Sequence, residues 1–93
     1  EFRRVLFRSS EGTANASLFS PRDIYNEALR YGAVNIVLLH NHPGGSAEPS
    51  EADIKGTMQI YRAGRIIGIE LQDHIIIGDG IYLSLKEQGY MNE

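Results

Sequence analysis

The chain has 93 residues, of which 42% are hydrophobic and 23% charged, with a net charge of −3 and no cysteine. This composition indicates one small soluble globular domain and excludes a disulfide framework or a thiolate metal site. The negative charge disfavours tight non-specific binding to duplex nucleic acid. No apolar run approaches the roughly 20 residues that span a bilayer, and a chain without cysteine fits a reducing compartment, so we expect a cytoplasmic protein.

The first third of the chain predicts one or two strands followed by a helix. Residues 5–7 form a short β-like run between arginines, and residues 13–19 alternate small apolar and polar side chains. Ser20, Pro21 and Asp23 then supply an N-cap, a proline at the first helical position and an acid in the first turn. We therefore expect a helix over residues 21–31. The residues expected on its apolar face are Ile24, Tyr25, Ala28, Leu29 and Tyr31.

The middle of the chain predicts a buried strand and a second helix. Residues 34–39 are an almost continuous Val/Ile/Leu run, which is typical of a strand that is covered on both faces and central in its sheet. After a Gly/Pro loop, Ser50 is expected to cap a helix that ends between Gly64 and Gly68. The residues expected on the core side of this helix are Ile54, Met58 and Tyr61.

The last third predicts two strands joined by a hairpin. Residues 69–77 form a strand, and Gly78-Asp79-Gly80 supply a tight turn. The return strand is expected to carry Ile81, Leu83 and Leu85. The order β-(β)-α-β-α-β-β indicates an α/β domain with helices packed on a single small mixed sheet.

Two histidines and an aspartate are candidate metal ligands. His40 and His42 follow the buried strand, and in extended backbone their side chains point to the same face, about 6.5 Å apart at the backbone. Asp53 can reach the same point if the Gly44-Gly45 loop folds the start of the next helix back over the strand end. Zinc accepts imidazole nitrogen and carboxylate oxygen, and a catalytic zinc site keeps one position for water. The sequence therefore predicts a zinc site.

The same residues also have structural explanations. Histidines spaced His-x-His at a strand end are more often surface or capping residues than metal ligands. Ser50-x-x-Asp53 resembles a capping box, which stabilises a helix start without any metal. Asp73-His74 is a polar pair in an apolar strand. One interpretation is a role beside the site or in a substrate groove. The other, which we favour, is a hydrogen-bonded structural histidine at a strand twist.

These motifs resemble a known family. The run from His40 to Gly45, with Ser50 and Asp53, is similar to the His-x-His-Pro…Ser-x-x-Asp signature of the JAMM (MPN or JAB type) metalloproteases, and most similar to their bacterial RadC-like branch. Further matching segments are residues 12–13, 21–24, 28–29, 73–78 and 87–89, so that the resemblance covers about residues 10–91. It implies a cytidine-deaminase-like architecture that is truncated at the N-terminus here.

The resemblance also implies a function. The domain would be a zinc-dependent metallopeptidase or isopeptidase-like hydrolase, in which a metal-activated water attacks a peptide or protein substrate. His40, His42 and Asp53 would hold the zinc, Ser50 would stabilise an oxyanion, and Glu1 would be the general base.

The N-terminus departs from the family pattern. The family has a longer hairpin between the glutamate-bearing strand and the residues that match Gly12-Thr13, whereas only residues 8–11 intervene here. We therefore treat residues 1–9 as a separate segment of foreign, truncated or misjoined origin, and residues 10–93 as the RadC-like domain.

Two other functions remain alternatives. A catalytically silent domain would serve as an interaction scaffold. The family's DNA-repair label suggests nucleic-acid processing, against which the net charge and the scattered aromatic residues argue. An exposed edge strand near either terminus could also support a homodimer or hold an extended peptide by strand addition.

Overall fold

A computed structural model of the chain describes residues 4–10 (backbone only), 20–42 and 46–92. Its elements are β1 (Arg4–Ser10), α1 (Pro21–Arg30), β2 (Asn35–Asn41), α2 (Glu51–Ile67), β3 (Glu70–Ile77) and β4 (Tyr82–Ser84). The α/β class and the short strand at the N-terminus are confirmed. The strand predicted over residues 13–19 lies outside the described residues.

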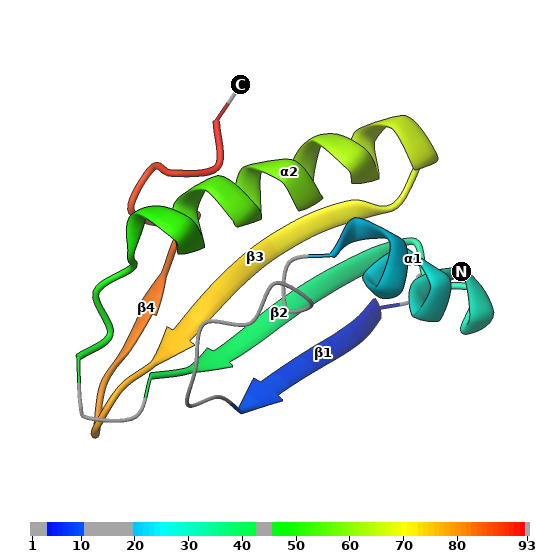
Figure 1. Cartoon of the computed structure of the whole chain (residues 1–93). Helices are drawn as coiled ribbons and strands as arrows, with labels where there is room; N and C mark the ends of the chain where they lie inside the picture. The colour runs from blue at the N-terminus through cyan, green and yellow to red at the C-terminus, as the bar shows by residue number, and fades with distance from the viewer. Residues whose placement is uncertain (1–3, 11–19, 43–45, 93) are drawn as a thin grey trace.

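The four strands form one mixed sheet in the order β1-β2-β3-β4. β1, β2 and β3 are parallel, and β4 is antiparallel to β3. Both β-α-β crossovers follow the right-handed rule, so α1 and α2 lie on the same face of the sheet, as Figure 1 shows. β2 is central as predicted. Coverage of both its faces was predicted, but among the described elements the helices cover only one.

α1 begins as predicted but buries a narrower face. The Asp23 N–H donates to the Ser20 side chain at 3.3 Å, and Pro21 follows the cap directly. Ile24, Tyr25 and Ala28 are buried, as predicted. The prediction was wrong for Leu29 and Tyr31, which are 61% and 56% exposed. Leu29 lies about 140° around the helix from Ile24, and Tyr31 is already the C-cap, so neither can face the core.

α2 ends within the predicted interval but is rotated from its predicted orientation. Gly68, with a φ of 92°, is its C-cap. The residues that it buries are Asp53, Gly56, Thr57, Ile60 and Gly64. The predicted core residues Ile54, Met58 and Tyr61 are only half-buried. Small side chains on the buried face explain the difference, because they let the helix approach the sheet and α1 closely.

A β-bulge in β3 decides which of its side chains face the helices. Ile36 pairs with Leu71 and Val37 with Asp73, so Gln72 is the extra residue. Because side chains alternate along a strand, the bulge shifts the inward set after Leu71 by one position. His74 and Ile76 are therefore buried beneath the helices, where unbroken alternation would place Asp73 and Ile75.

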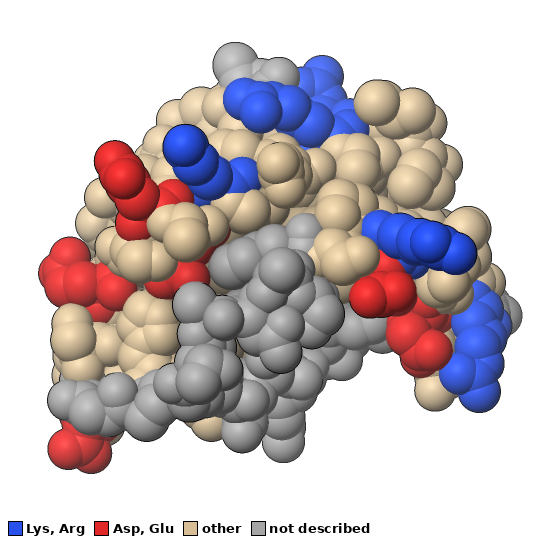
Figure 2. Space-filling model, viewed as in Figure 1, with Lys and Arg blue, Asp and Glu red and all other residues tan. Residues whose placement is uncertain are grey.

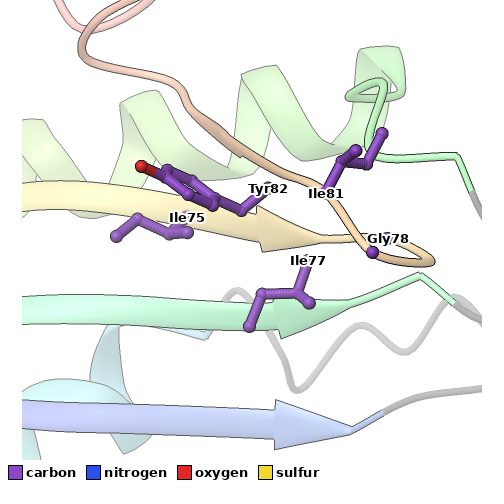
Figure 3. Close-up of a pocket in the computed structure, with 6 residues that line it drawn as sticks. Ile75, Ile77, Gly78, Ile81 and Tyr82 are labelled. Carbon is purple, nitrogen blue, oxygen red and sulfur yellow. The ribbon is translucent and has the colours of Figure 1, made fainter.

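The β3–β4 hairpin forms at the predicted glycines. The Gly78 N–H donates to the Ile81 carbonyl oxygen at 2.8 Å. β4 is shorter than predicted, and Leu85 is buried in the turn that follows it. The side chains of Ile75, Ile77, Ile81 and Tyr82 line an apolar hollow beside this hairpin (Figure 3). Ile75 and Ile77 alternate with the buried Ile76, so the hollow lies on the face of the sheet away from the helices.

None of the described helices combines the length and apolar character that a bilayer crossing needs. Figure 2 shows basic and acidic side chains interspersed on one face, without a continuous basic surface over the described part of that face.

The close packing around Gly64 of α2 predicts that a larger side chain there lowers stability. A Cβ at this position would collide with the Ile69 carbonyl oxygen and the Tyr25 hydroxyl. We expect Gly64→Ala to lower the free energy of unfolding by about 2 kcal/mol in urea titrations, although helix propensity alone would raise it by about 0.5–1 kcal/mol. The exposed Gln59→Ala on the same helix is the control and should be nearly neutral. Equal or greater stability of Gly64→Ala would contradict this packing.

Candidate metal centre

The three predicted ligands come together where β2 ends and α2 begins. His40 is the last buried residue of β2, and His42 directly follows the strand. The His42 N–H donates to the Ile77 carbonyl oxygen at 2.9 Å, which extends the pairing with β3 and fixes the backbone there. Asp53 is the third residue of α2, so its carboxylate faces back toward the strand end. Loop residues 43–45 lie outside the described residues.

The distances within this group suit a single metal ion. His42 Nε2 lies 3.1 Å from Asp53 Oδ2, and His40 Nδ1 lies 3.6 Å from Asp53 Oδ1. One ligand atom from each residue lies within 4.8 Å of the others. Tetrahedral zinc with bonds of 2.0–2.1 Å separates its ligand atoms by about 3.3 Å. The two imidazole-to-carboxylate distances, each to a different oxygen of Asp53, lie on either side of that edge length.

A hydrogen bond from His42 orients its ring. His42 Nδ1 lies 3.1 Å from the Ser46 carbonyl oxygen. A carbonyl oxygen only accepts, so Nδ1 carries the proton, and in a neutral ring Nε2 then presents a lone pair. That lone pair faces the Asp53 carboxylate, which is also an acceptor. Two acceptors at 3.1 Å need a cation between them, either a proton that makes His42 an imidazolium or a metal ion.

The site is closed on one side and open on the other. The side chains of His40 and Asp53 are 7% and 6% exposed, whereas that of His42 is 21% exposed. Solvent or a substrate can therefore approach on the His42 side. Three candidate ligands among the described residues, with one of them partly exposed, fit the pattern of catalytic zinc, whereas structural zinc is enclosed by four protein ligands.

The predicted capping box at the start of α2 is confirmed. The Asp53 N–H donates to Ser50 Oγ at 3.0 Å, and the Ser50 N–H donates to Asp53 Oδ2 at 2.8 Å. Capping and metal binding are compatible, because a carboxylate has about four lone-pair sites and the backbone N–H uses one. The cap also aims the carboxylate at the two imidazoles.

Thr57 and His74 form a buried pair next to the candidate ligands. Thr57 Oγ1 donates to the Asp53 carbonyl oxygen at 2.6 Å and lies 2.6 Å from His74 Nδ1. Because the Thr57 proton goes to that carbonyl, His74 Nδ1–H is the donor in the second bond. The ring of His74 stacks on that of His40, with centroids 5.8 Å apart. Burial, and then repulsion from His40, lowers the pKa of His74 to about 4.

Asp73 has a different role from His74. Its Oδ1 accepts from the N–H groups of His74 at 2.7 Å and Lys86 at 3.1 Å, and its Oδ2 accepts from the Ser84 hydroxyl at 2.6 Å. These bonds tie β3 to β4 and to the turn after it. His74 is hydrogen-bonded and follows the bulge, as predicted for a structural histidine at a strand twist, and it also lies against His40, as predicted for a role beside the site.

The structure brings together four of the five predicted site residues. His40, His42, Asp53 and Ser50 are neighbours, whereas Glu1 lies outside the described residues and its role stays a prediction. Sequence reasoning missed Thr57 and Ser46. Thr57 had one available signal, because it lies one helical turn after Asp53 on the same face.

Comparison with known proteins decides the family. The profile of the RadC-like JAB domain matches residues 5–90. The chain belongs to this family. It is 49% identical over 79 residues to a UPF0758 protein of Shouchella clausii, which covers 85% of the chain and 34% of that protein. It is 50% identical over 82 residues to a UPF0758 protein of Clostridium acetobutylicum, covering 88% of the chain and 36% of that protein.

A further relative shows the same relation. A UPF0758 protein of Geobacillus kaustophilus is 46% identical over 90 residues, covering 95% of the chain and 40% of that protein. The chain thus spans roughly a third of the length of these RadC-like relatives. Their names state no activity. The family and the α/β fold are thereby established, and the chemistry has to be argued from the site.

The two hydrogen bonds of the capping box predict how a substitution of Ser50 changes stability. In metal-free protein, Ser50→Ala removes the acceptor for the Asp53 N–H, so we expect the free energy of unfolding to fall by about 1 kcal/mol in urea titrations. Ser50→Thr keeps the acceptor and should lose less. An unchanged stability of Ser50→Ala would mean that this cap does not contribute to folding.

Proposed function

We propose that His40, His42 and Asp53 bind one zinc ion, and that this RadC-like domain is a metal-dependent hydrolase of peptide or isopeptide bonds. The observation that carries the proposal is the contact of His42 Nε2 with a carboxylate oxygen of Asp53 at 3.1 Å, beside His40. Nδ1 of the same ring is committed to the Ser46 carbonyl oxygen. His42 and Asp53 would both be satisfied by a metal held between them, and outer hydrogen bonds of this kind typically orient metal-binding histidines.

The donor set favours zinc over other common ions. Two imidazole nitrogens and one carboxylate oxygen suit zinc, whereas magnesium and calcium prefer oxygen ligands alone. Zinc in such a site lowers the pKa of a bound water and polarises a scissile carbonyl. Membership of the RadC-like JAB family, together with the resemblance of the ligand residues to the JAMM signature, supports hydrolysis.

Ser50 is proposed to act on the substrate. Its Oγ accepts the Asp53 N–H, which uses one lone pair and leaves the hydroxyl proton available. That proton can be donated to an oxyanion that develops on the substrate carbonyl beside the metal. Glu1 is proposed as the general base, on the resemblance alone.

Metal content tests the binding half of the proposal. We expect purified protein to hold about one zinc per chain by mass spectrometry of the native protein, and His40→Ala or Asp53→Ala to hold almost none, because two ligands cannot retain the ion. Asp79→Ala removes an exposed aspartate in the hairpin and is the matched control. A parent protein that stays free of zinc in micromolar zinc buffer would make the His42–Asp53 contact an ion pair and overturn the proposal.

Hydrolysis tests the catalytic half. Cleavage of a peptide and isopeptide library should be abolished by a chelator and restored by zinc. We expect Ser50→Ala to keep its zinc while kcat falls by about 10²–10³, the usual loss for one oxyanion donor. A parent that binds zinc and cleaves nothing would instead favour the scaffold function.

A further inference from the structure

A buried hydrogen-bonded path links the candidate ligand Asp53 to His74 in the sheet. Asp53 lies on α2 and His40 on β2, so their separation depends on how the helix is held against the sheet. Thr57 lies one helical turn after Asp53, and its hydroxyl bonds the Asp53 carbonyl oxygen. His74 lies on β3 and donates to the same hydroxyl. The path therefore runs from Asp53 through Thr57 and His74 into the sheet.

The other end of this path contacts His40. β3 pairs directly with β2, with Ile76 opposite His40 and Ile77 opposite Asn41. The ring of His74 also stacks on that of His40 at an interplanar angle of 22°. A displacement of His74 would therefore shift His40 through the ring contact and Asp53 through Thr57.

The surroundings leave this pair little freedom. Thr57 and His74 are 0% and 1% exposed, and water cannot replace either partner without opening the interface between α2 and β3. The two hydrogen bonds of Thr57 are both 2.6 Å. Metal sites need their ligands held to within about 0.5 Å, and buried side-chain hydrogen bonds supply that restraint.

We propose that Thr57 and His74 are positioning residues of the metal centre, which hold the first turn of α2 at the distance from β2 that lets Asp53 share an ion with His40 and His42. This rests on the proposed zinc site. Thr57 and His74 do not bind the ion themselves. Their function is to keep the geometry of the empty site close to that of the loaded one, which raises affinity by removing the cost of rearrangement.

The test compares zinc affinity in variants of the full chain by competition with a chromogenic chelator. Thr57→Val keeps the shape of the side chain but loses the hydroxyl, and we expect it to raise the Kd for zinc by about 10–100-fold. Thr57→Ser restores the hydroxyl and should stay within about threefold of the parent. Tyr25→Phe is the matched control, because it removes a buried hydroxyl that donates to the Ile60 carbonyl oxygen of the same helix, at 2.8 Å, outside the site.

A second readout separates positioning from loss of stability. Cobalt(II) in place of zinc gives an absorption spectrum that depends on coordination geometry. We expect Thr57→Val to change this spectrum, and Thr57→Ser and Tyr25→Phe to keep it, even if Tyr25→Phe lowers the melting temperature as much as Thr57→Val. If Thr57→Val does not fold, His74→Leu, which removes the donor, is compared with His74→Asn, which offers an N–H near the place of Nδ1. His74→Leu should then weaken zinc binding more.

The outcomes distinguish this inference from the function on which it rests. A parent that binds zinc, with Thr57→Val of equal affinity and an unchanged cobalt spectrum, overturns the positioning role and leaves the zinc site standing. A Tyr25→Phe variant that loses affinity as much as Thr57→Val also overturns it, since any destabilised α2 would then weaken binding. A parent that binds no zinc overturns both.

Discussion

The rest of the site depends on the contacts of the Asp53 carboxylate. It accepts the Ser50 N–H, faces Nε2 of His42 and faces Nδ1 of His40. The first contact belongs to the helix and the other two to the end of β2. A buried carboxylate of this kind is costly unless it is paired, so the start of α2 and the end of β2 are held together by one group. The same position of the carboxylate caps α2 and brings it to the two histidines.

The sheet topology explains why this meeting point exists. Successive right-handed crossovers put α1 and α2 on one face and make β2 one of the two interior strands. The chain leaves β2 at its carboxyl end and must return along α2, so the helix start lies beside the strand end that it has just left. Ligands in open α/β sheets bind at this carboxyl edge. The apolar hollow of the β3–β4 hairpin opens near the same edge but on the face away from the helices.

Local patterns in the sequence were sufficient for the candidate ligands and the caps, because those features depend on neighbouring residues. The His-x-His spacing, the Ser50 cap and the hairpin glycines are all set within a few positions of the chain. The buried face of α2 could not be predicted in that way. Ile54, Met58 and Tyr61 are its larger apolar residues, yet the helix buries the smaller Gly56, Thr57 and Gly64 instead. Close approach to Tyr25 and the Ile69 carbonyl oxygen decides this rotation, and both contacts are set by the tertiary structure.

The bulge at Gln72 was equally hidden, and it matters most for the site. Alternation from Leu71 would place Asp73 under the helices and His74 on the opposite face. The extra residue reverses this, so Asp73 reaches the turn after β4 while His74 reaches Thr57 and stacks on His40. A charged carboxylate under α2 would lie near Asp53, and two buried carboxylates repel each other. The bulge therefore places the His74 ring, which can donate to Thr57, where a charged carboxylate would otherwise lie. Asp53 is then the one buried carboxylate among the described residues beside the histidines.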